Sequence, residues 1–339
     1  MVSAETLRRV WQPNRGVSPL LRQIVEALPL AIVLAALVMT IAALEPRFLG
    51  PANVNNLLRN ALVLATIASG QMLVMMTGGF DLSVGAVAAL SSVVSALVMV
   101  VLGPVLPDGD VIVSFAGVTA GLLSGMILGG INGFCVAWFQ APALIVTLGM
   151  LSVATGLSFY LTSGAPIYGL PKVFTDDFAL GRVFGLSNIV LCCVVVLVAI
   201  WILQRHLPMG RHIRAVGGNL RMARLSGVNT KGTLLFTYAL SGVISAFVGV
   251  LLTARLGSGQ STAGVDLMLP SIAVAVIGGV SLRGGSGRIE TVILGGFFLA
   301  VVANGMNLLR LDSRYQTIAI GAIIILVTLL DRFVRARRG

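Results

Sequence analysis

Charge is scarce in this sequence. Only 10% of its 339 residues are Asp, Glu, Lys or Arg, and 57% are hydrophobic, whereas soluble domains carry about 25% charged residues. The charge-free runs suit membrane helices, which need about 20 apolar residues, and exceed the strands of about 10 residues found in membrane barrels. Because backbone polar groups in lipid must be bonded internally, we expect these runs to be helical.

Residues that catalyse reactions or hold metals are also few. The chain has two histidines, His206 and His212, and three cysteines, Cys135, Cys192 and Cys193, none with metal-ligand spacing. The phosphate-binding pattern G-x-x-x-x-G-K-[ST] is absent, so ATP hydrolysis by that route is excluded. No Ser/His/Asp constellation is supported. We therefore expect no enzyme activity, no metal and no cofactor.

The apolar runs predict an all-α, polytopic membrane protein of ten transmembrane helices. The transmembrane domain is expected over 28–331, between tails at 1–27 and 332–339. The first run is expected to be a retained span, since no small-x-small cleavage pattern follows it. The run at 111–139 is long enough to be tilted or broken, and the run at 265–280 is short. The expected spans are 28–44, 57–77, 83–102, 111–139, 141–161, 187–204, 233–254, 265–280, 289–311 and 315–331.

The net charge of +11 reflects an uneven distribution of basic residues rather than a nucleic-acid partner. Alternate loops hold most of them, and the intervening loops hold acids such as Glu45, Asp108, Asp176 and Asp312. Basic loops stay in the cytoplasm, so both termini are expected there and the number of spans is even. The basic set contains 16 of the 23 Lys and Arg residues: Arg8, Arg9, Arg15, Arg22, Arg205, Arg211, Arg214, Arg221, Arg224, Lys231, Arg283, Arg288, Arg332, Arg335, Arg337 and Arg338.

A weak internal repeat is visible. Residues 77–85 read TGGFDLSVG and residues 277–285 read IGGVSLRGG, while ILGG occurs at 127–130 and again at 293–296. Repeats built from interrupted helices are common in transporters. The offsets of the two matches differ, however, and glycine-rich membrane sequence also produces such matches by chance.

Small and neutral polar residues lie inside the predicted spans. Glycines recur every four residues from Gly121 to Gly133, which places them on one helix face and predicts close helix packing. Neutral polar groups without a buried set of ionisable ones fit a neutral substrate and oppose a proton relay. These groups are Gln71, Asn132, Thr147, Ser152, Asn304 and Asn307.

The basic loop at 204–232 is the most informative polar segment. Gly217-Gly218-Asn219 predicts a turn with Asn219 as an N-cap. Residues 220–226 can then form about two helical turns, ended by Gly227. Such a helix suits docking onto another protein, and an ordinary topology-setting loop is the alternative.

Two acids lie beside predicted helix starts. Asp81 interrupts the apolar stretch between the second and third spans, where a charge is costly and often functional. It can equally cap the helix that begins near Ser83. Glu290, at the start of the ninth span, has the same capping interpretation.

Three motifs carry a resemblance to a known family. TGGFDLSVG resembles the signature of ribose-type ABC transporter permeases, T-G-G-I-D-L-S-V-G, with Phe80 in place of isoleucine. GGNLRMARLSGVN at 217–229 resembles the cytoplasmic coupling segment of that family, and IGGVSLRGGSG at 277–287 resembles its C-terminal glycine-rich signature. The acidic residue often found before the coupling alanine is missing from Leu220-Arg221-Met222, which leaves the detail of the ATPase contact open.

The resemblance implies the membrane permease of an ABC importer for a monosaccharide in a bacterial inner membrane. Its implied partners are cytoplasmic ATP-binding subunits, an extracytoplasmic sugar-binding protein, a second permease copy or paralogue, and membrane lipid. The implied coupling residues are Gly218, Asn219, Ala223, Arg224 and Gly227. The signature or gating candidates are Gly78, Gly79, Asp81, Ser83, Gly85, Gly278, Gly279 and Gly284.

Three rival functions stay open. One is an ABC permease for another small solute, such as a purine nucleoside or a branched-chain amino acid. Another is a secondary transporter driven by an ion gradient, for which Asp81 is the one serious charge. A membrane enzyme acting on lipid or glycan would need a polar catalytic cluster, and none is visible.

Overall fold

The computed structural model describes residues 19–336. Most of the predicted N-terminal tail and the last three residues, including Arg8, Arg9, Arg15, Arg337 and Arg338, lie outside the described residues.

The short elements are 3-10 turns η1 (Pro46–Leu49), η2 (Gly103–Val105) and η4 (Val265–Leu267), a π-helical turn η3 (Val173–Phe178), and an antiparallel hairpin of β1 (Arg182–Val183) and β2 (Leu186–Ser187). The helices are α2 (Pro19–Leu44), α3 (Pro51–Met76), α4 (Val84–Leu102), α5 (Asp110–Trp138), α6 (Ala143–Thr162), α7 (Asn188–Arg205), α8 (Pro208–Gly218), α9 (Leu220–Leu225), α10 (Thr230–Leu256), α11 (Met268–Ile277), α12 (Ile289–Leu308) and α13 (Ser313–Ala336).

The predicted helical, polytopic architecture is confirmed. Among the described residues, seven helices are long and apolar enough to cross a membrane: α3, α4 with η2, α5, α6, α7, α10 and α12. Shorter apolar helices occupy 28–44 and 265–277, and α13 occupies the tenth predicted span. Ten crossings therefore remain a prediction.

Two of the predicted spans, at 111–139 and 265–280, differ in whether a single helix fills them. The run at 111–139 forms one unbroken helix of 29 residues, α5. The run at 265–280 instead divides into η4 and the ten-residue α11. Pro270 lies in the first turn of α11, where its missing N–H leaves no helical bond unmade. Gly279, with φ +75°, then ends the helix.

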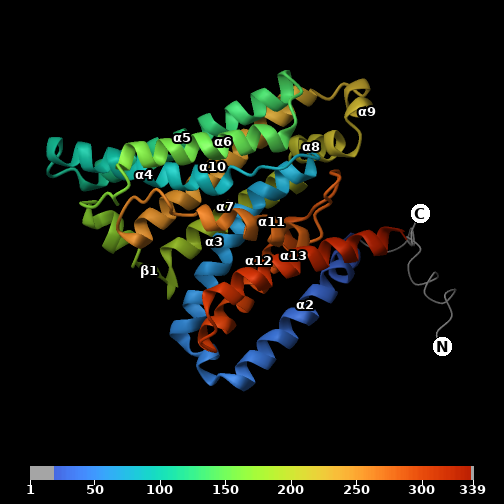
Figure 1. Ribbon diagram of the computed structural model, residues 1–339, viewed down its shortest axis with the longest axis horizontal. Helices are drawn as coiled ribbons and strands as arrows, with labels where there is room; N and C mark the ends of the chain where they lie inside the picture. Colours follow the sequence, from blue (N-terminus) through green and yellow to red (C-terminus); the bar gives the residue numbers. More distant parts are fainter. Residues whose placement is uncertain (1–18, 337–339) are drawn as a thin grey trace.

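The helices run between two ends of the molecule (Figure 1). The start of α2, the end of α13, the α8–α9 segment and the 278–288 loop lie toward the right of that view. The α4–α5, α6–α7, α10–α11 and α12–α13 connections lie toward the left or lower left. The loops that hold most of the basic residues thus share one end, as the charge pattern predicts.

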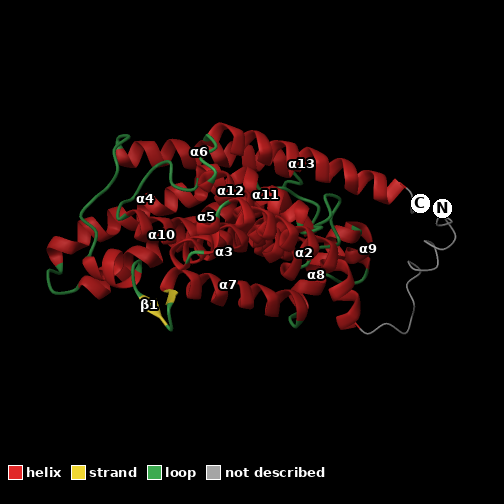
Figure 2. Ribbon diagram, turned by 90° about the horizontal axis from the view of Figure 1, so that it is seen from below, coloured by secondary structure: helices red, strands yellow, loops and turns green. Residues whose placement is uncertain are grey.

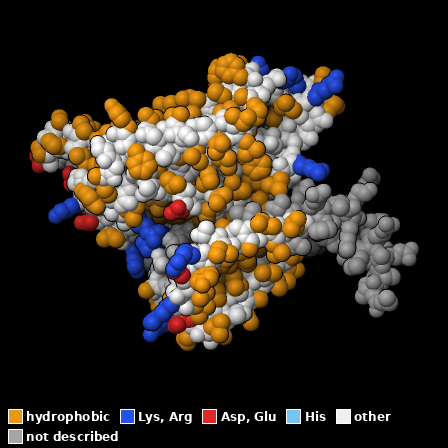
Figure 3. Space-filling model, in the orientation of Figure 1, with side chains coloured by type: hydrophobic (Ala, Val, Ile, Leu, Met, Phe, Trp, Pro, Cys, Tyr) orange, Lys and Arg blue, Asp and Glu red, His pale blue; other side chains and the backbone are white. Residues whose placement is uncertain are grey.

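The core is built around α3. All of its residues from 65 to 76 are buried, and its apolar side chains join one cluster with those of α7, α10, α11 and α12. Figure 2 shows α7 and α13 on opposite faces, with α3, α11 and α12 between them. The outer surface is apolar across its middle, and Lys and Arg gather at the upper right and lower left (Figure 3). This is the surface expected of a protein embedded in lipid.

The predicted close packing of the glycine face on α5 is confirmed. A Cβ at Gly125 would overlap the carbonyl oxygen of Gly242 on α10. A Cβ at Gly133 would lie 2.8 Å from Leu235 Cα, also on α10. Small residues on both helices let the backbones approach to a distance that larger side chains would prevent.

Candidate functional site

The short helix α9 forms as its sequence predicts. Asn219 Oδ1 accepts a hydrogen bond from Met222 N at 3.0 Å, which makes Asn219 the N-cap. Ser226 follows the last helical residue, and Gly227 then takes a left-handed conformation with φ +80°. The left-handed region suits glycine because it has no Cβ.

The turn expected at Gly217 and Gly218 is wrong. Both residues belong to the last turn of α8, a helix that the sequence did not predict. Pro208 stands at its start, where proline is favoured. Its buried residues, Gly210, Ile213 and Val216, lie at helical spacing on one face. The loop therefore contains two helices, α8 packed inward and α9 at the surface.

Three glycine pairs from distant parts of the sequence, 78–79, 217–218 and 284–285, meet at the end of α8. A Cβ at Gly217 would overlap the carbonyl oxygen of Met76, the last residue of α3. A Cβ at Gly284 would lie 2.7 Å from Gly217 O and 2.9 Å from Gly78 N. Gly285 N also donates a hydrogen bond to Met76 O at 2.9 Å. The predicted coupling segment and the two predicted glycine signatures thus pack backbone against backbone.

The two signature loops share local geometry. Gly78 has φ +86° and is followed by a Gly79 N to Val74 O bond of 3.3 Å. Gly279 has φ +75° and is followed by a Val280 N to Ala275 O bond of 3.0 Å. Both are left-handed helix endings of one kind. The equivalent glycine comes one residue later than the letter match implies, so the repeat is degenerate even here.

Asp81 is buried in the first of these loops, and its carboxylate accepts three hydrogen bonds. Oδ1 accepts from Ser83 N at 3.0 Å and from Ser83 Oγ at 2.6 Å, and Oδ2 accepts from Ser241 Oγ at 3.0 Å. Asn132 Nδ2 in turn donates to Ser83 Oγ at 3.0 Å. Ser83 is the N-cap residue of α4. Asp81 therefore binds the N–H of the N-cap residue and ties the loop to α10, while Ser83 ties it to α5.

The other two signature glycines lie elsewhere. A Cβ at Gly85 would lie 2.8 Å from the carbonyl oxygens of Gly264 and Val265, where α4 passes η4. A Cβ at Gly278 would lie 2.8 Å from Val292 Cα, where α11 meets α12. Both positions require glycine for close approach.

The interpretation of Glu290 as a helix cap is wrong. Its Oε1 accepts a hydrogen bond from Trp201 Nε1 at 3.0 Å and lies 3.7 Å from Arg205 Nη1. The side chain therefore connects α12 to α7 instead of folding back onto its own helix start. Trp201 offers a fixed N–H donor one helix away, and a buried indole N–H usually finds such a partner.

The neutral polar residues divide into bonded and unbonded groups. Asn304 and Asn53 exchange two hydrogen bonds, at 2.8 and 2.9 Å, between α12 and α3. Thr147 Oγ1 donates to Phe80 O at 3.3 Å. Asn307 accepts from Gln316 at 2.7 Å, and Ser152 bonds its own helix. Gln71 is fully buried, and neither polar atom of its side chain has a partner.

Gln204, at the end of α7, is a connecting residue that the sequence did not reveal. Its Nε2 donates to Gly287 O at 2.8 Å, and its Oε1 accepts from Ile289 N at 3.1 Å. Its backbone oxygen accepts from Arg214 Nη2 at 2.7 Å. One residue thus links α7, α8 and the start of α12. A lone glutamine at the end of an apolar run gives no sign of such partners.

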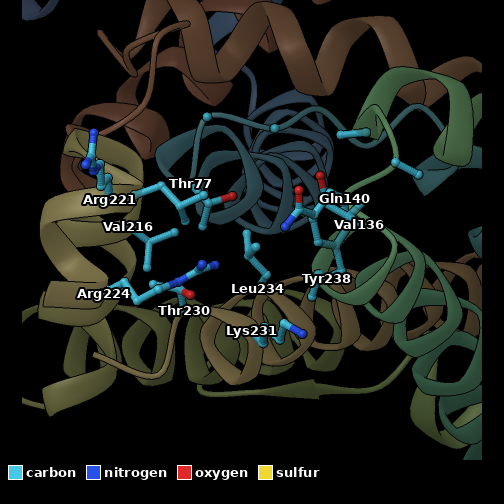
Figure 4. A pocket seen from close by; sticks show the side chains of 16 residues that line it. Thr77, Val136, Gln140, Val216, Arg221, Arg224, Thr230, Lys231, Leu234 and Tyr238 are labelled. Carbon is cyan, nitrogen blue, oxygen red and sulfur yellow. The ribbon is translucent and has the colours of Figure 1, made fainter. Parts of the chain in front are cut away.

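A cavity of about 540 Å³ lies between α9 and the first signature loop. Thr77, Gly78 and Gly79 line one side, and residues of α5, the 140–143 segment, α8, α9 and α10 line the rest. Figure 4 shows Arg224 of α9 reaching into this space, and Arg221 of the same helix also lines it. Tyr238 of α10 also lines the cavity. Predicted coupling residues and predicted signature residues therefore share one cavity.

One protein family matches most of the chain. Residues 53–328 match the family described as "Branched-chain amino acid transport system / permease component". The chain belongs to this permease family. The permease is accordingly a multi-pass membrane protein that serves transport, and it is not an enzyme.

Curated relatives align along most of the permease. The ribose import permease protein RbsC of Bacillus subtilis is 37% identical over 298 residues, covering 87% of this chain and 89% of that relative. The D-allose transport system permease protein AlsC of Escherichia coli is 34% identical, covering 89% and 90%. The L-arabinose ABC transporter permease protein AraH of Azospirillum brasilense is 31% identical, covering 93% and 90%. No solved structure matches.

Proposed function

We propose that the permease is the membrane-spanning subunit of an ATP-binding-cassette importer for a monosaccharide. The observation that carries this proposal is the set of near full-length relatives named for ribose, D-allose and L-arabinose. These relatives come from bacteria, and we place the permease in the bacterial cytoplasmic membrane. The scarcity of ionisable groups within the spans fits a neutral sugar.

The proposed topology has ten crossings and both termini in the cytoplasm. Its support is that the start of α2, α8–α9, the 278–288 loop and the end of α13 share one end of the molecule (Figure 1). Most of the basic residues of the sequence lie in these segments and the tails beside them. The transmembrane domain then covers 28–331, and 1–27 and 332–339 are cytoplasmic tails. The local likeness of the two signature loops supports a degenerate repeat.

The α9 helix is the proposed docking point for the ATP-binding subunits. It exposes three apolar side chains, those of Leu220, Met222 and Leu225, on a helix of only six residues. Exposed apolar side chains gathered in one place indicate an interaction surface. Ala223 is buried beneath them, and Gly218, Asn219, Arg224 and Gly227 complete the coupling segment.

Alternating access is the proposed mechanism. ATP binding in the partner subunits displaces α9 and the attached α8. Because Gly217 touches the end of α3 and Gly284 touches both Gly217 and Gly78, the displacement reaches both signature loops. The loops with Gly78, Gly79, Asp81, Ser83, Gly279 and Gly284 are then the proposed gating elements. ATP binding thereby shifts the balance between the conformations that open to the two sides of the membrane. This chain performs no chemistry itself.

The remaining partners are proposed from the opposite end. The connection between α6 and α7 exposes Tyr168, Leu180 and Phe184, with Phe184 fully exposed at the tip of the hairpin. Aromatic side chains are frequent in protein interfaces. We assign this face to an extracytoplasmic sugar-binding protein. A second permease copy or paralogue and membrane lipid are proposed to cover the apolar sides.

Energy source and docking are tested together in cells that express the importer. Uptake of labelled D-ribose, D-allose or L-arabinose is expected to stop on ATP depletion and to survive collapse of the ion gradients. Leu225→Ser is expected to reduce uptake at least tenfold, because it removes the most exposed apolar contact of α9. Leu207→Ser, an exposed apolar position of the same segment outside α9, is the control.

Two outcomes would contradict these proposals. Uptake that collapses with the ion gradients would favour a secondary transporter. Transport of a branched-chain amino acid or a purine nucleoside, without any of the three sugars, would move the permease to another solute class. If Leu225→Ser and Leu207→Ser transport equally well, α9 is not the docking helix.

A further inference from the structure

A second cavity lies at the end of the molecule opposite α9. It has a volume of about 380 Å³ and lies between α3, α10, α12 and the η4–α11 segment. Small-molecule sites range from about 300 to 1,000 Å³, so the space can hold one monosaccharide. No motif or resemblance points to this region. Its lining includes a polar group, comprising Asn56, Asn60, Arg255, Asp266, Asn304 and Asn307.

Part of this polar group is held in place by hydrogen bonds. Arg255 Nη1 donates to Asn60 Oδ1 at 2.8 Å, which joins α10 to α3 across the cavity wall. Asn60 Nδ2 lies 3.4 Å from Asn56 Oδ1, one turn earlier on α3. Asn304 on the facing helix α12 is fixed by its paired bonds with Asn53. The amides are therefore positioned before any ligand arrives, which lowers the entropy cost of binding.

The remaining hydrogen-bonding capacity suits a polyhydroxylated ligand. A guanidinium has five N–H donors, and one of those of Arg255 is used on Asn60. Within the described part of the chain, the Asp266 carboxylate has no hydrogen-bond or ion-pair partner. Each sugar hydroxyl both donates and accepts, so it can use amide, guanidinium and carboxylate groups alike. Leu252 and Leu299 supply an apolar wall for the C–H face of a sugar ring.

The charges of the lining also favour a neutral ligand. Arg255 is its one cation and Asp266 its one anion, so neither an anion nor a cation is favoured as a whole. A zwitterionic amino acid would use only these two charges and leave the spare hydrogen-bonding capacity of the four amides unused. Unpartnered polar groups penalise binding. A ring of hydroxyls uses all six polar residues.

We propose that this cavity is the site where the monosaccharide enters the permease from the extracytoplasmic side. The assignment rests on the proposed function and adds the residues that receive the sugar. The cavity lies between an uninterrupted helix, α3, and the interrupted η4–α11 segment. Transporter substrate sites often lie beside such interrupted helices.

Protection of an introduced cysteine tests the site. Ala303 lines the cavity on α12 and is small, so Ala303→Cys places a thiol there with little disturbance. Val302→Cys, the adjacent position that does not line the cavity, is the matched control. Both are made in a background where Cys135, Cys192 and Cys193 are alanine. Labelling by an impermeant maleimide is followed in cells that express the complete importer, with and without sugar at about 10 mM, which would fill a site of millimolar Kd.

The expected result is that a sugar transported by the cells slows labelling of Ala303→Cys about fivefold or more and leaves Val302→Cys unchanged. The inference is overturned if the cells transport the sugar and labelling of Ala303→Cys is the same with and without it; the proposed function would then still stand. It is also overturned if leucine protects and no sugar does. Absence of uptake of all three sugars would refute the proposed function itself.

Asn60→Leu provides an independent measurement. It keeps the side-chain size and removes the amide, and Asn55→Leu, five residues earlier on α3 and outside the cavity lining, is the control. At equal protein levels, Asn60→Leu is expected to raise the KM for sugar uptake tenfold or more relative to Asn55→Leu. Equal KM values for the two variants would contradict a sugar contact at this position.

Discussion

At Gly217 a single hydrogen atom serves as side chain because no larger group fits. The carbonyl oxygen of Met76 occupies the place of a Cβ, while the neighbouring Gly218 has open space at the same position. Both glycines lie in the last turn of α8. Of these two adjacent glycines, Gly217 makes a tight backbone contact and Gly218 faces open space.

This pair yields a prediction with a built-in control. Gly217→Ala is expected to lower the free energy of unfolding of the purified permease by about 1–3 kcal/mol, the usual cost of overpacking. The reason is that α8 must move away from α3 to make room for the methyl group. Gly218→Ala is expected to have little effect. Thermal unfolding in detergent measures the first effect, and sugar uptake is expected to fall with it. Equal stability of both variants would show that the contact of α8 with α3 is not close.

Single residues also mark the limit of sequence analysis. The short distance in sequence between Asp81 and Ser83 pointed to a local bond beside a helix start, and the structure contains one. The additional bond to Ser241 crosses 160 residues, and no spacing rule could reveal it. Glu290 stood beside a helix start too, yet Trp201 of another helix engages its carboxylate. Local partners are visible in sequence, and partners from other helices depend on packing.

At the scale of elements, α9 could be predicted and α8 could not. Asn219 and Gly227 are strong signals for the two ends of a short helix. The α8 helix has no capping side chain and ends in two glycines, which favour a turn when read alone. It exists because its apolar face packs on the ends of α7, α10 and α3, with Ile213 fully buried. Tertiary packing overrides the local propensity there.

The connection of α7 to the start of α12 gives the element-scale prediction. Gln204→Leu leaves Gly287 O and Ile289 N without their side-chain partner. Each unsatisfied buried group costs about 1–3 kcal/mol, so thermal stability is expected to fall clearly. Gln71→Leu is the matched control, because neither polar side-chain atom of Gln71 has a partner. It is expected to leave stability unchanged or higher, and a loss equal to that of Gln204→Leu would contradict the role assigned to Gln204.

At the scale of the whole molecule, hydropathy located the helices well because length and apolarity suffice to define a span. All ten predicted segments contain a helix, although the 265–280 run divides into η4 and α11. What hydropathy lacks is the arrangement. The meeting of 78–79, 217–218 and 284–285 follows from backbone contacts between distant segments. The short glycine matches identified two of these segments as related, and only the fold shows that they touch.

The orientation of the whole molecule gives the final prediction. Asp108 lies in the α4–α5 connection and Ser226 directly after α9, at opposite ends of the molecule, and both are exposed. In a cysteine-free background, an impermeant maleimide is expected to label Asp108→Cys in intact spheroplasts and Ser226→Cys only after the membrane is opened. The physical reason is the retention of basic loops in the cytoplasm. If both positions label from the same side, the number of crossings between them is even, and the assignment of α5, α6 and α7 as three separate spans must be wrong.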